Sequence, residues 1–166
     1  YTAVHGVQAI APLAIKLLRS GDDRVANPIG FERFRDAFFE KFVNLTEPLA
    51  LLDYELDHHA GNKGEVACHA DISIDGESKK ISGLGNGPIN AFVHALEQVG
   101  LKNFTLTDYR SHAVRGGSDA DSAAYVQLQG LDGNGLVWGC GIDPSIEMAG
   151  LKALVSAANL LVAKES

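Results

Sequence analysis

The last two thirds of this sequence repeat themselves, and this duplication limits the possible folds more than any other feature. Asp53-Tyr54 recurs 55 residues later as Asp108-Tyr109, and the glycine-rich segment 83–88 recurs 56 residues later as segment 139–144. Each copy shows the same order of patterns: three apolar extended segments, a pair of glycines, a proline and an amphipathic helix. The sequence therefore predicts an α+β fold with a duplicated β-β-β-α unit. We expect pseudo-twofold symmetry, so that a site at the junction is built from both copies.

The first copy, residues 47–100, carries clear boundary signals. Asp75-Gly76 is a strong hairpin signal between its second and third strands. Pro88 suits the first turn of a helix, and Gly100 suits the end of one. The helix is indicated by an apolar stripe that includes Ile89 and Leu96. The expected strands are Leu49–Asp57, Val66–Ile74 and Lys79–Leu84.

The second copy, residues 101–166, has the same plan. Asp132-Gly133 is its matching turn, and an apolar stripe between Leu151 and Val162 indicates the closing helix. The expected strands are Asn103–Val114, Ala123–Gln129 and Leu136–Gly139. The two copies together, residues 47–166, are expected to form one domain.

Residues 1–46 are expected to form a short helical linker or subdomain ahead of this domain. The apolar residues between Ile10 and Leu18 follow the spacing of a helix face, and a second helical stretch carries four phenylalanines on one stripe. We interpret the stripe as a helix docked on its own domain, with an aromatic ligand-binding surface as the alternative. The four residues are Phe31, Phe34, Phe38 and Phe42.

Composition argues against several classes of partner. The net charge is −7, the pI is near 5.3 and no run of Lys or Arg exists, so we expect no nucleic-acid partner. The longest apolar run, 9–15, is far shorter than a membrane-spanning helix. The first residues lack the pattern of a secretory signal, and a chain that starts at Tyr1 is expected to be part of a longer protein. Cys68 and Cys140 are expected to be buried thiols of a cytoplasmic protein.

The segment Gly83–Pro88 resembles a phosphate-binding loop only superficially. Pro88 stands where the third glycine of a dinucleotide-binding motif belongs, and antiparallel hairpins precede it. The segment nevertheless opens a helix whose first N–H groups lack intrahelical partners, so a small anion such as a carboxylate can dock there. The alternative is that these glycines serve only a turn that needs positive φ.

No metal site or catalytic group is predicted. His58 and His59 are adjacent on an expected strand and point to opposite faces, and no HxH, HxxxH or CxxC spacing exists. Asp119 and Asp121 lack the further ligands of a calcium loop. No serine or cysteine lies in a nucleophile elbow, so a small stand-alone enzyme is the weakest alternative.

The duplicated tyrosines suit either the edge of a core or one wall of a small-molecule pocket. Tyr54 and Tyr109 occupy equivalent strand positions, and each has an apolar ring with a polar tip. Small residues follow Tyr109 and leave space beside it, although close packing of strand on helix is an equally simple reason for them. These residues are Ala113, Gly116, Gly117, Ala120 and Ser122.

Several motifs in this order resemble the C-terminal regulatory domain of 2-isopropylmalate synthase, from about Phe31 to about Val162. They are Ile81-Ser82-Gly83, Gly85-Asn86-Gly87-Pro88, Asp108-Tyr109, His112-Ala113, Asp119-Ala120, Ala123-Ala124-Tyr125-Val126, Trp138-Gly139-Cys140-Gly141-Ile142 and Pro144-Ser145-Ile146. In that family an N-terminal barrel condenses acetyl-CoA with 2-oxoisovalerate and holds a divalent metal. The resemblance implies that this chain is catalytically silent, holds no cofactor, forms a homodimer, joins such a barrel and binds L-leucine as a feedback inhibitor.

The resemblance also implies a ligand pocket built from both repeats. The isobutyl group of leucine needs an apolar slot, and full burial of such a group contributes roughly 1.5–3 kcal/mol. The alternatives are the isoleucine-binding domain of citramalate synthase, which has the same domain type, and a dimerisation module without a ligand. The implied pocket residues are Gly85, Asn86, Gly87, Pro88 and Ile89 from the first copy, Leu106, Tyr109, Ala113, Ala120 and Ser122 from the second, and Pro144 and Ile146 from the second glycine segment.

Overall fold

A computed structural model describes residues 41–58, 64–113, 122–130 and 135–165 of the chain. The predicted helix at 10–18 and the first three phenylalanines of the aromatic stripe lie outside these residues. The expected division of the chain at residue 46 stays a prediction.

The first repeat forms an antiparallel sheet in the order β1-β2-β3. The turn between β2 and β3 is the predicted Asp75-Gly76 hairpin, in which both residues have positive φ, 52° and 86°. This is the backbone geometry that a two-residue hairpin matching the twist of its strands requires. The strands are β1 (Leu49–Asp57), β2 (Val66–Ile74) and β3 (Glu77–Gly85).

The second repeat forms an antiparallel sheet of the same kind, in the order β4-β5-β6. Its first strand has a register shift between Leu106 and Asp108, and the first strand of the other sheet has one between Leu51 and Asp53. This matching irregularity supports the duplication independently of the motifs. Asp132-Gly133 lies outside the described residues. The strands are β4 (Phe104–Ala113), β5 (Ser122–Gly130) and β6 (Leu136–Asp143).

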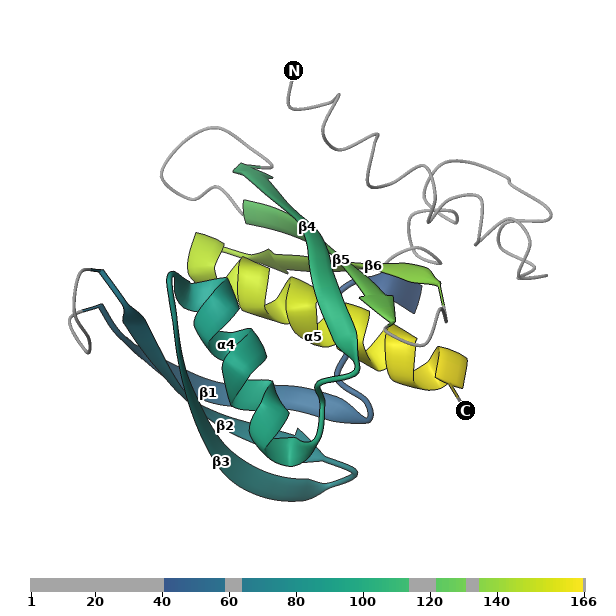
Figure 1. Cartoon of the computed structure of the whole chain (residues 1–166). Helices are drawn as coiled ribbons and strands as arrows, with labels where there is room; N and C mark the ends of the chain where they lie inside the picture. Colours follow the sequence, from purple (N-terminus) through teal and green to yellow (C-terminus); the bar gives the residue numbers. More distant parts are fainter. Residues whose placement is uncertain (1–40, 59–63, 114–121, 131–134, 166) are drawn as a thin grey trace.

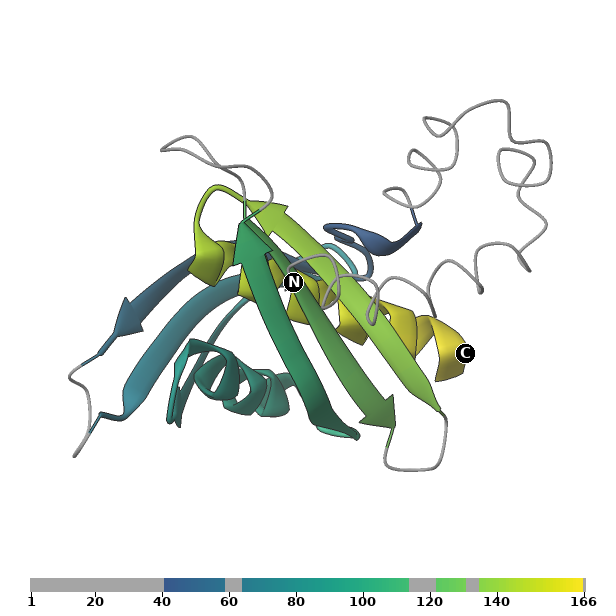
Figure 2. The ribbon, with the colours of Figure 1, turned by 90° about the horizontal axis from the view of Figure 1, so that it is seen from above.

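Each sheet is followed by a helix that packs on its second and third strands. Helix α4 (Pro88–Leu96) contacts β2 and β3, and α5 (Ile146–Glu165) contacts β5 and β6 and reaches across to β1 (Figures 1 and 2). A short 3-10 turn, η1 (Glu97–Val99), follows α4, and Gly100 ends it with a φ of 83° as predicted. The duplicated β-β-β-α fold is therefore confirmed.

The glycines of the first repeat serve helix packing, so the interpretation of a positive-φ turn is wrong. Gly83 and Gly85 lie inside β3, and neither has positive φ. A Cβ at Gly83 would lie 2.5 Å from the Ala91 carbonyl oxygen, and one at Gly85 would lie 2.5 Å from the Ala91 nitrogen. Glycine is required here because the backbone of α4 touches the backbone of β3.

The second repeat uses its glycines in the same way. The expected strand Leu136–Gly139 was too short, because β6 continues to Asp143 through the glycine pair. A Cβ at Gly139 would lie 2.7 Å from Ala157 Cα, and one at Gly141 would lie 2.5 Å from the Ala153 nitrogen. The duplicated glycines are thus strand positions against which a helix packs closely.

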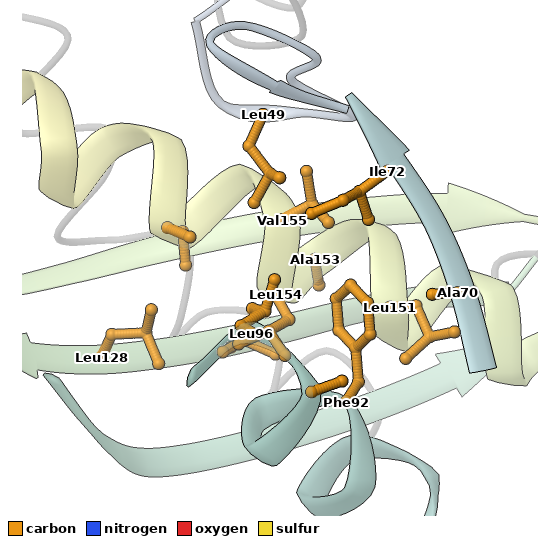
Figure 3. Packing of buried hydrophobic residues seen from close by; sticks show 14 of the residues in the cluster. Leu49, Ala70, Ile72, Phe92, Leu96, Leu128, Leu151, Ala153, Leu154 and Val155 are labelled. Atoms are coloured by element: carbon orange, nitrogen blue, oxygen red, sulfur yellow. The ribbon is translucent and has the colours of Figure 1, made fainter. Parts of the chain in front are cut away.

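One apolar core joins the two repeats. Phe92 and Leu96 from α4 lie against Leu151 and Leu154 from α5, with side chains of both sheets around them (Figure 3). All four side chains are fully buried. Burial of apolar surface is the main force that stabilises such a core. The two units therefore share one apolar core.

A smaller apolar cluster lies on the other face of the second sheet. Phe42, the last phenylalanine of the predicted stripe, is buried there against Tyr125, Trp138 and Cys140. His112 stacks on the Tyr125 ring, with ring centres 5.5 Å apart. Phe42 thus packs on its own domain, as the docking interpretation of the stripe predicts for this residue.

Candidate functional site

The two helices begin at the same end of the molecule, where β4 ends (Figures 1 and 2). Residues that are far apart in sequence meet at this junction. A Cβ built on Gly150 of α5 would lie 2.9 Å from Ile89 Cδ1 of α4 and 3.0 Å from the Tyr109 hydroxyl oxygen of β4. The predicted site residues Ile89 and Tyr109 are therefore brought together, and Gly150 lies between them.

The inner face of β4 continues from this contact. Leu106, Tyr109 and Ala113 lie on the face that is directed to the helices, because they pair with Leu128, Val126 and Ser122 of β5. Leu106 packs partly buried against the core, whereas Tyr109 is 39% exposed and Ala113 is exposed. Along this face β4 thus presents an apolar side chain, an aromatic ring and a small side chain, in that order.

Helix α4 begins without a side-chain cap. Its N-cap residue is Gly87, Pro88 follows, and no acidic residue lies in the first turn. The Asn90 side chain accepts a hydrogen bond from the Asn86 backbone nitrogen at 3.1 Å and does not cap the helix. The positive end of the helix dipole and its first N–H groups are therefore available to an anion.

Helix α5 begins in the opposite way. The Met148 N–H donates to Ser145 Oγ at 3.3 Å, and the Asp143 carboxylate accepts from the Ser145 N–H and the Lys152 ammonium, both at 2.9 Å. Glu147 adds an acid to the first turn. The start of α5 is thus neutralised by the chain's own groups.

The remaining predicted site residues fall into different places. Pro144 and Ile146 are exposed at the start of α5, and Gly85 is buried under α4. Asn86 is exposed directly before α4, and Ser122 begins β5 beside Ala113. Ala120 lies outside the described residues, as do Asp119, Asp121, Gly116 and Gly117.

Sequence reasoning missed Gly150. The only signal available was a glycine inside a helical pattern, where it costs about 1 kcal/mol relative to alanine. Its packing role depends on Ile89 and Tyr109, which belong to two other elements.

The pseudo-equivalent junction, at the end of β1, carries different side chains. His58 follows β1 in the position that Ala113 takes at the end of β4, and its Nε2 lies 3.6 Å from a Glu147 carboxylate oxygen of α5. The His58 side chain is 53% exposed and that of Glu147 is 40% exposed, so the two form a surface contact where the other repeat has an alanine. The two junctions therefore differ although the fold is duplicated.

A depression of about 310 Å³ lies over the first sheet and is lined by Tyr54 but by none of the residues of the implied leucine pocket. Its rim is polar, and Lys80 Nζ forms an exposed ion pair of 3.1 Å with Asp71. Such a charged sheet face is ordinary solvent-exposed surface. Its lining consists of Asp53, Tyr54, Glu55, His69, Ala70, Asp71, Lys80, Ile81 and Ser82.

The described part of the chain shows no group of three His, Cys, Asp or Glu residues placed to hold a metal ion. Cys68 and Cys140 are free and buried, as predicted, and burial raises the pKa of the two thiols to about 11 and about 12. They therefore stay protonated near neutral pH. No helix within the described ranges is long and apolar enough to cross a membrane.

Comparison with known proteins gives related matches. The 2-isopropylmalate synthase of Mycobacterium leprae (strain TN) is 42% identical over 124 residues, which are 75% of this chain and 20% of that protein. The 2-isopropylmalate synthase of Mycobacterium ulcerans (strain Agy99) is 38% identical over 146 residues, 88% of this chain and 25% of that protein. The 2-isopropylmalate synthase of Thermobifida fusca (strain YX) is 49% identical over 96 residues, which are 58% of this chain and 16% of that protein. The chain thus spans a quarter or less of the length of these relatives.

The family model described as the LeuA allosteric (dimerisation) domain matches residues 31–162. This region contains both β-β-β-α units, and it agrees with the extent of the resemblance seen in the sequence. The resemblance to the regulatory domain of 2-isopropylmalate synthase is therefore confirmed. Since the match covers most of its length, the chain belongs to the LeuA allosteric (dimerisation) domain family.

Proposed function

We infer that this domain binds L-leucine at the junction of α4, β4 and α5 and acts as the feedback-inhibited, dimer-forming part of a 2-isopropylmalate synthase. The observation that carries this proposal is the close approach of Ile89 and Tyr109 to the position that a side chain on Gly150 would take, beside the uncapped start of α4. The family match and the relatives support the same function.

The chemistry of the junction suits a free amino acid. We propose that the N–H groups of Ile89 and Asn90, in the uncapped first turn of α4, receive the carboxylate. Ile89 and Leu106 offer apolar surface to the isobutyl group, and Ala113 leaves room at the end of β4. At the pseudo-equivalent junction a histidine takes the place of this alanine and lies beside Glu147, so that end of the fold is the less suitable site for an amino acid.

The whole protein is proposed to be an acetyl-CoA-dependent acyltransferase of the cytoplasm. Its catalytic barrel and divalent metal would belong to the part that precedes this domain. The domain itself would hold no cofactor and would contribute leucine binding and homodimer contacts. Two protonated buried thiols agree with a reducing compartment.

The test is calorimetric titration of the chain with L-leucine, L-isoleucine, L-valine and L-leucinamide, with sedimentation of the same samples. Leucine-selective heat on a dimer, lost with leucinamide because the carboxylate is absent, is the expected result. Isoleucine selectivity would move the proposal to citramalate synthase. No heat from any amino acid on a folded dimer would leave a dimerisation module and refute the pocket.

A further inference from the structure

Helix α5 carries two buried polar side chains on an otherwise apolar surface. Ser156 is 0% exposed and Asn159 is 2% exposed, and they are the only buried polar or charged side chains in the described part of the chain. Burial of a hydroxyl or an amide is unfavourable unless hydrogen bonds replace those made with water. The hydrogen-bond partners of Ser156 and Asn159 therefore indicate the structural role of these two residues.

Their partners are backbone groups of one segment, residues 42–49, which we call the connector. The Leu45 N–H donates to Ser156 Oγ at 2.7 Å, and the Leu49 N–H donates to Asn159 Oδ1 at 2.8 Å. Asn159 Nδ2 donates to the Leu49 carbonyl oxygen at 2.9 Å and to the Leu45 carbonyl oxygen at 3.2 Å. A single side-chain amide thus holds both ends of the stretch from Leu45 to Leu49.

The connector is also attached to the edge of β6. Val43 makes a parallel bridge with Cys140, and the Asn44 N–H donates to the Cys140 carbonyl oxygen at 3.0 Å. The Asn44 side chain accepts from the Ile142 N–H at 2.9 Å and donates to the Ile142 carbonyl oxygen at 3.1 Å. The chain that precedes the domain therefore enters it along β6 and then α5.

The same helix forms one wall of the candidate amino-acid site. Ile89 and Tyr109 lie where a side chain on Gly150 would be, and Gly150 lies nine residues before Asn159 on α5. At a rise of about 1.5 Å per residue, the two positions are roughly 13 Å apart along one continuous helix. Any ligand-induced change in the position or mobility of α5 at Gly150 thus acts on the element that holds the connector.

We propose that α5 transmits occupancy of the amino-acid site to the connector, with Ser156 and Asn159 as the positioning residues. This inference rests on the proposed leucine site. A ligand that orders the junction reduces the local opening of α5. The hydrogen bonds of Ser156 and Asn159 with the connector, further along the same helix, then open less often. Leucine would in this way fix the path by which the preceding part of the protein joins this domain.

The test measures amide hydrogen exchange of Leu45 and Leu49 by NMR in the 166-residue chain, with and without L-leucine. We expect leucine to slow both amides at least fivefold. In Ser156→Ala the leucine effect should be lost at Leu45 and kept at Leu49, and in Asn159→Leu it should be lost at Leu49. Calorimetry on the same samples should give leucine affinity within threefold of the original chain, and Asn103→Ala, an exposed asparagine outside both regions, is the control.

A residue with only a structural role would change exchange equally with and without ligand. The inference is overturned if leucine binds but leaves Leu45 and Leu49 exchange unchanged, or if Ser156→Ala keeps the leucine effect at Leu45. Absence of leucine heat in the original chain would refute the proposed function and this inference together. The milder Ser156→Ala variant keeps the test decisive if Asn159→Leu fails to fold.

Discussion

Asn159 and Leu49 are joined by a pair of hydrogen bonds between one side-chain amide and one backbone residue. The Asn159 oxygen accepts from the Leu49 N–H at 2.8 Å, and its nitrogen donates to the Leu49 carbonyl at 2.9 Å. Leu49 is itself buried at the start of β1, so water is not available to replace either bond. The side-chain amide of Asn159 thus makes the two hydrogen bonds with Leu49 that a residue of a neighbouring strand would make.

Replacement of Asn159 by leucine should therefore destabilise the domain. The change leaves the Leu49 N–H and carbonyl groups buried without partners, and we expect a loss of about 2–4 kcal/mol in the free energy of unfolding. Urea denaturation followed by circular dichroism measures it. The exposed Asn103→Leu should stay within about 0.5 kcal/mol, and an equal loss in both variants would contradict the assigned role.

Substitution of Gly87 by aspartate should weaken leucine binding and stabilise the fold at the same time. Gly87 has an extended backbone, with φ −174°, and a Cβ there meets nothing within 4 Å. An aspartate would cap α4 and contribute about 0.3–1 kcal/mol, yet its carboxylate would take the N–H groups proposed for leucine.

Gly87→Asn is the matched control, because asparagine has the same shape without the charge. Calorimetry should show the aspartate variant binding leucine at least tenfold more weakly than the asparagine variant. Equal leucine affinity in the two variants would place the carboxylate away from α4.

Ala113→Phe should abolish leucine binding without unfolding the domain. The residue is exposed at the end of β4, so a phenyl ring can enter the junction without disturbing the core. Calorimetry and sedimentation on one sample separate the two effects. Thr105→Phe, at an exposed position on the other face of β4, should bind leucine normally. Retained binding in Ala113→Phe would exclude this end of β4 from the site.

Gly83→Ala should destabilise the first repeat by about 1–3 kcal/mol, because the added methyl group meets the backbone of α4. Backbone atoms cannot move aside as a flexible side chain does. Gly87→Ala, four residues later, adds the same methyl group in open space, so it should cost only the weaker N-cap propensity of alanine, about 0.5 kcal/mol. Thermal unfolding of the pair tests the close approach directly, and similar melting temperatures would argue against it.

Stability should fall as the pH rises above about 9. Burial raises the pKa of Cys68 to about 11 and of Cys140 to about 12, and burial followed by the nearby Cys140 raises the pKa of Tyr125 to about 12. Over this range the unfolded chain releases protons that the native chain keeps, so the free energy of unfolding decreases with pH. Urea titrations between about pH 8 and 10.5 measure the slope, which Cys68→Ala should reduce. A flat profile would contradict these raised pKa values.

Local signals predicted much of the fold. Asp75-Gly76 and Gly100 take the positive φ that their residue types favour, and Pro88 begins α4 as expected. These features depend on a few neighbouring residues, so the sequence alone contains the necessary information. The ends of β3 and β6 were not predicted correctly. Glycine usually indicates a turn, but Gly85 and Gly141 lie in strands because the backbone of a helix packs directly on them.

The site was harder to predict from the residues than the fold. The meeting of Ile89 with Tyr109 depends on how two repeats pack, and Gly150 gains its role only from that packing. Ser156 and Asn159 look like ordinary polar positions of a helix, and they are buried because a segment more than 100 residues earlier folds over them. Long-range contacts of this kind leave no periodic pattern in the sequence.

The shared core has a consequence for how the domain comes apart. Phe92 and Leu96 of one repeat lie against Leu151 and Leu154 of the other, so neither unit can lose its structure without exposing the buried surface of its neighbour. The β-β-β-α unit is duplicated, but the two copies together form one cooperative unit of unfolding. Melting of the domain is therefore expected as a single two-state transition, and an isolated half should have no stable native state of its own.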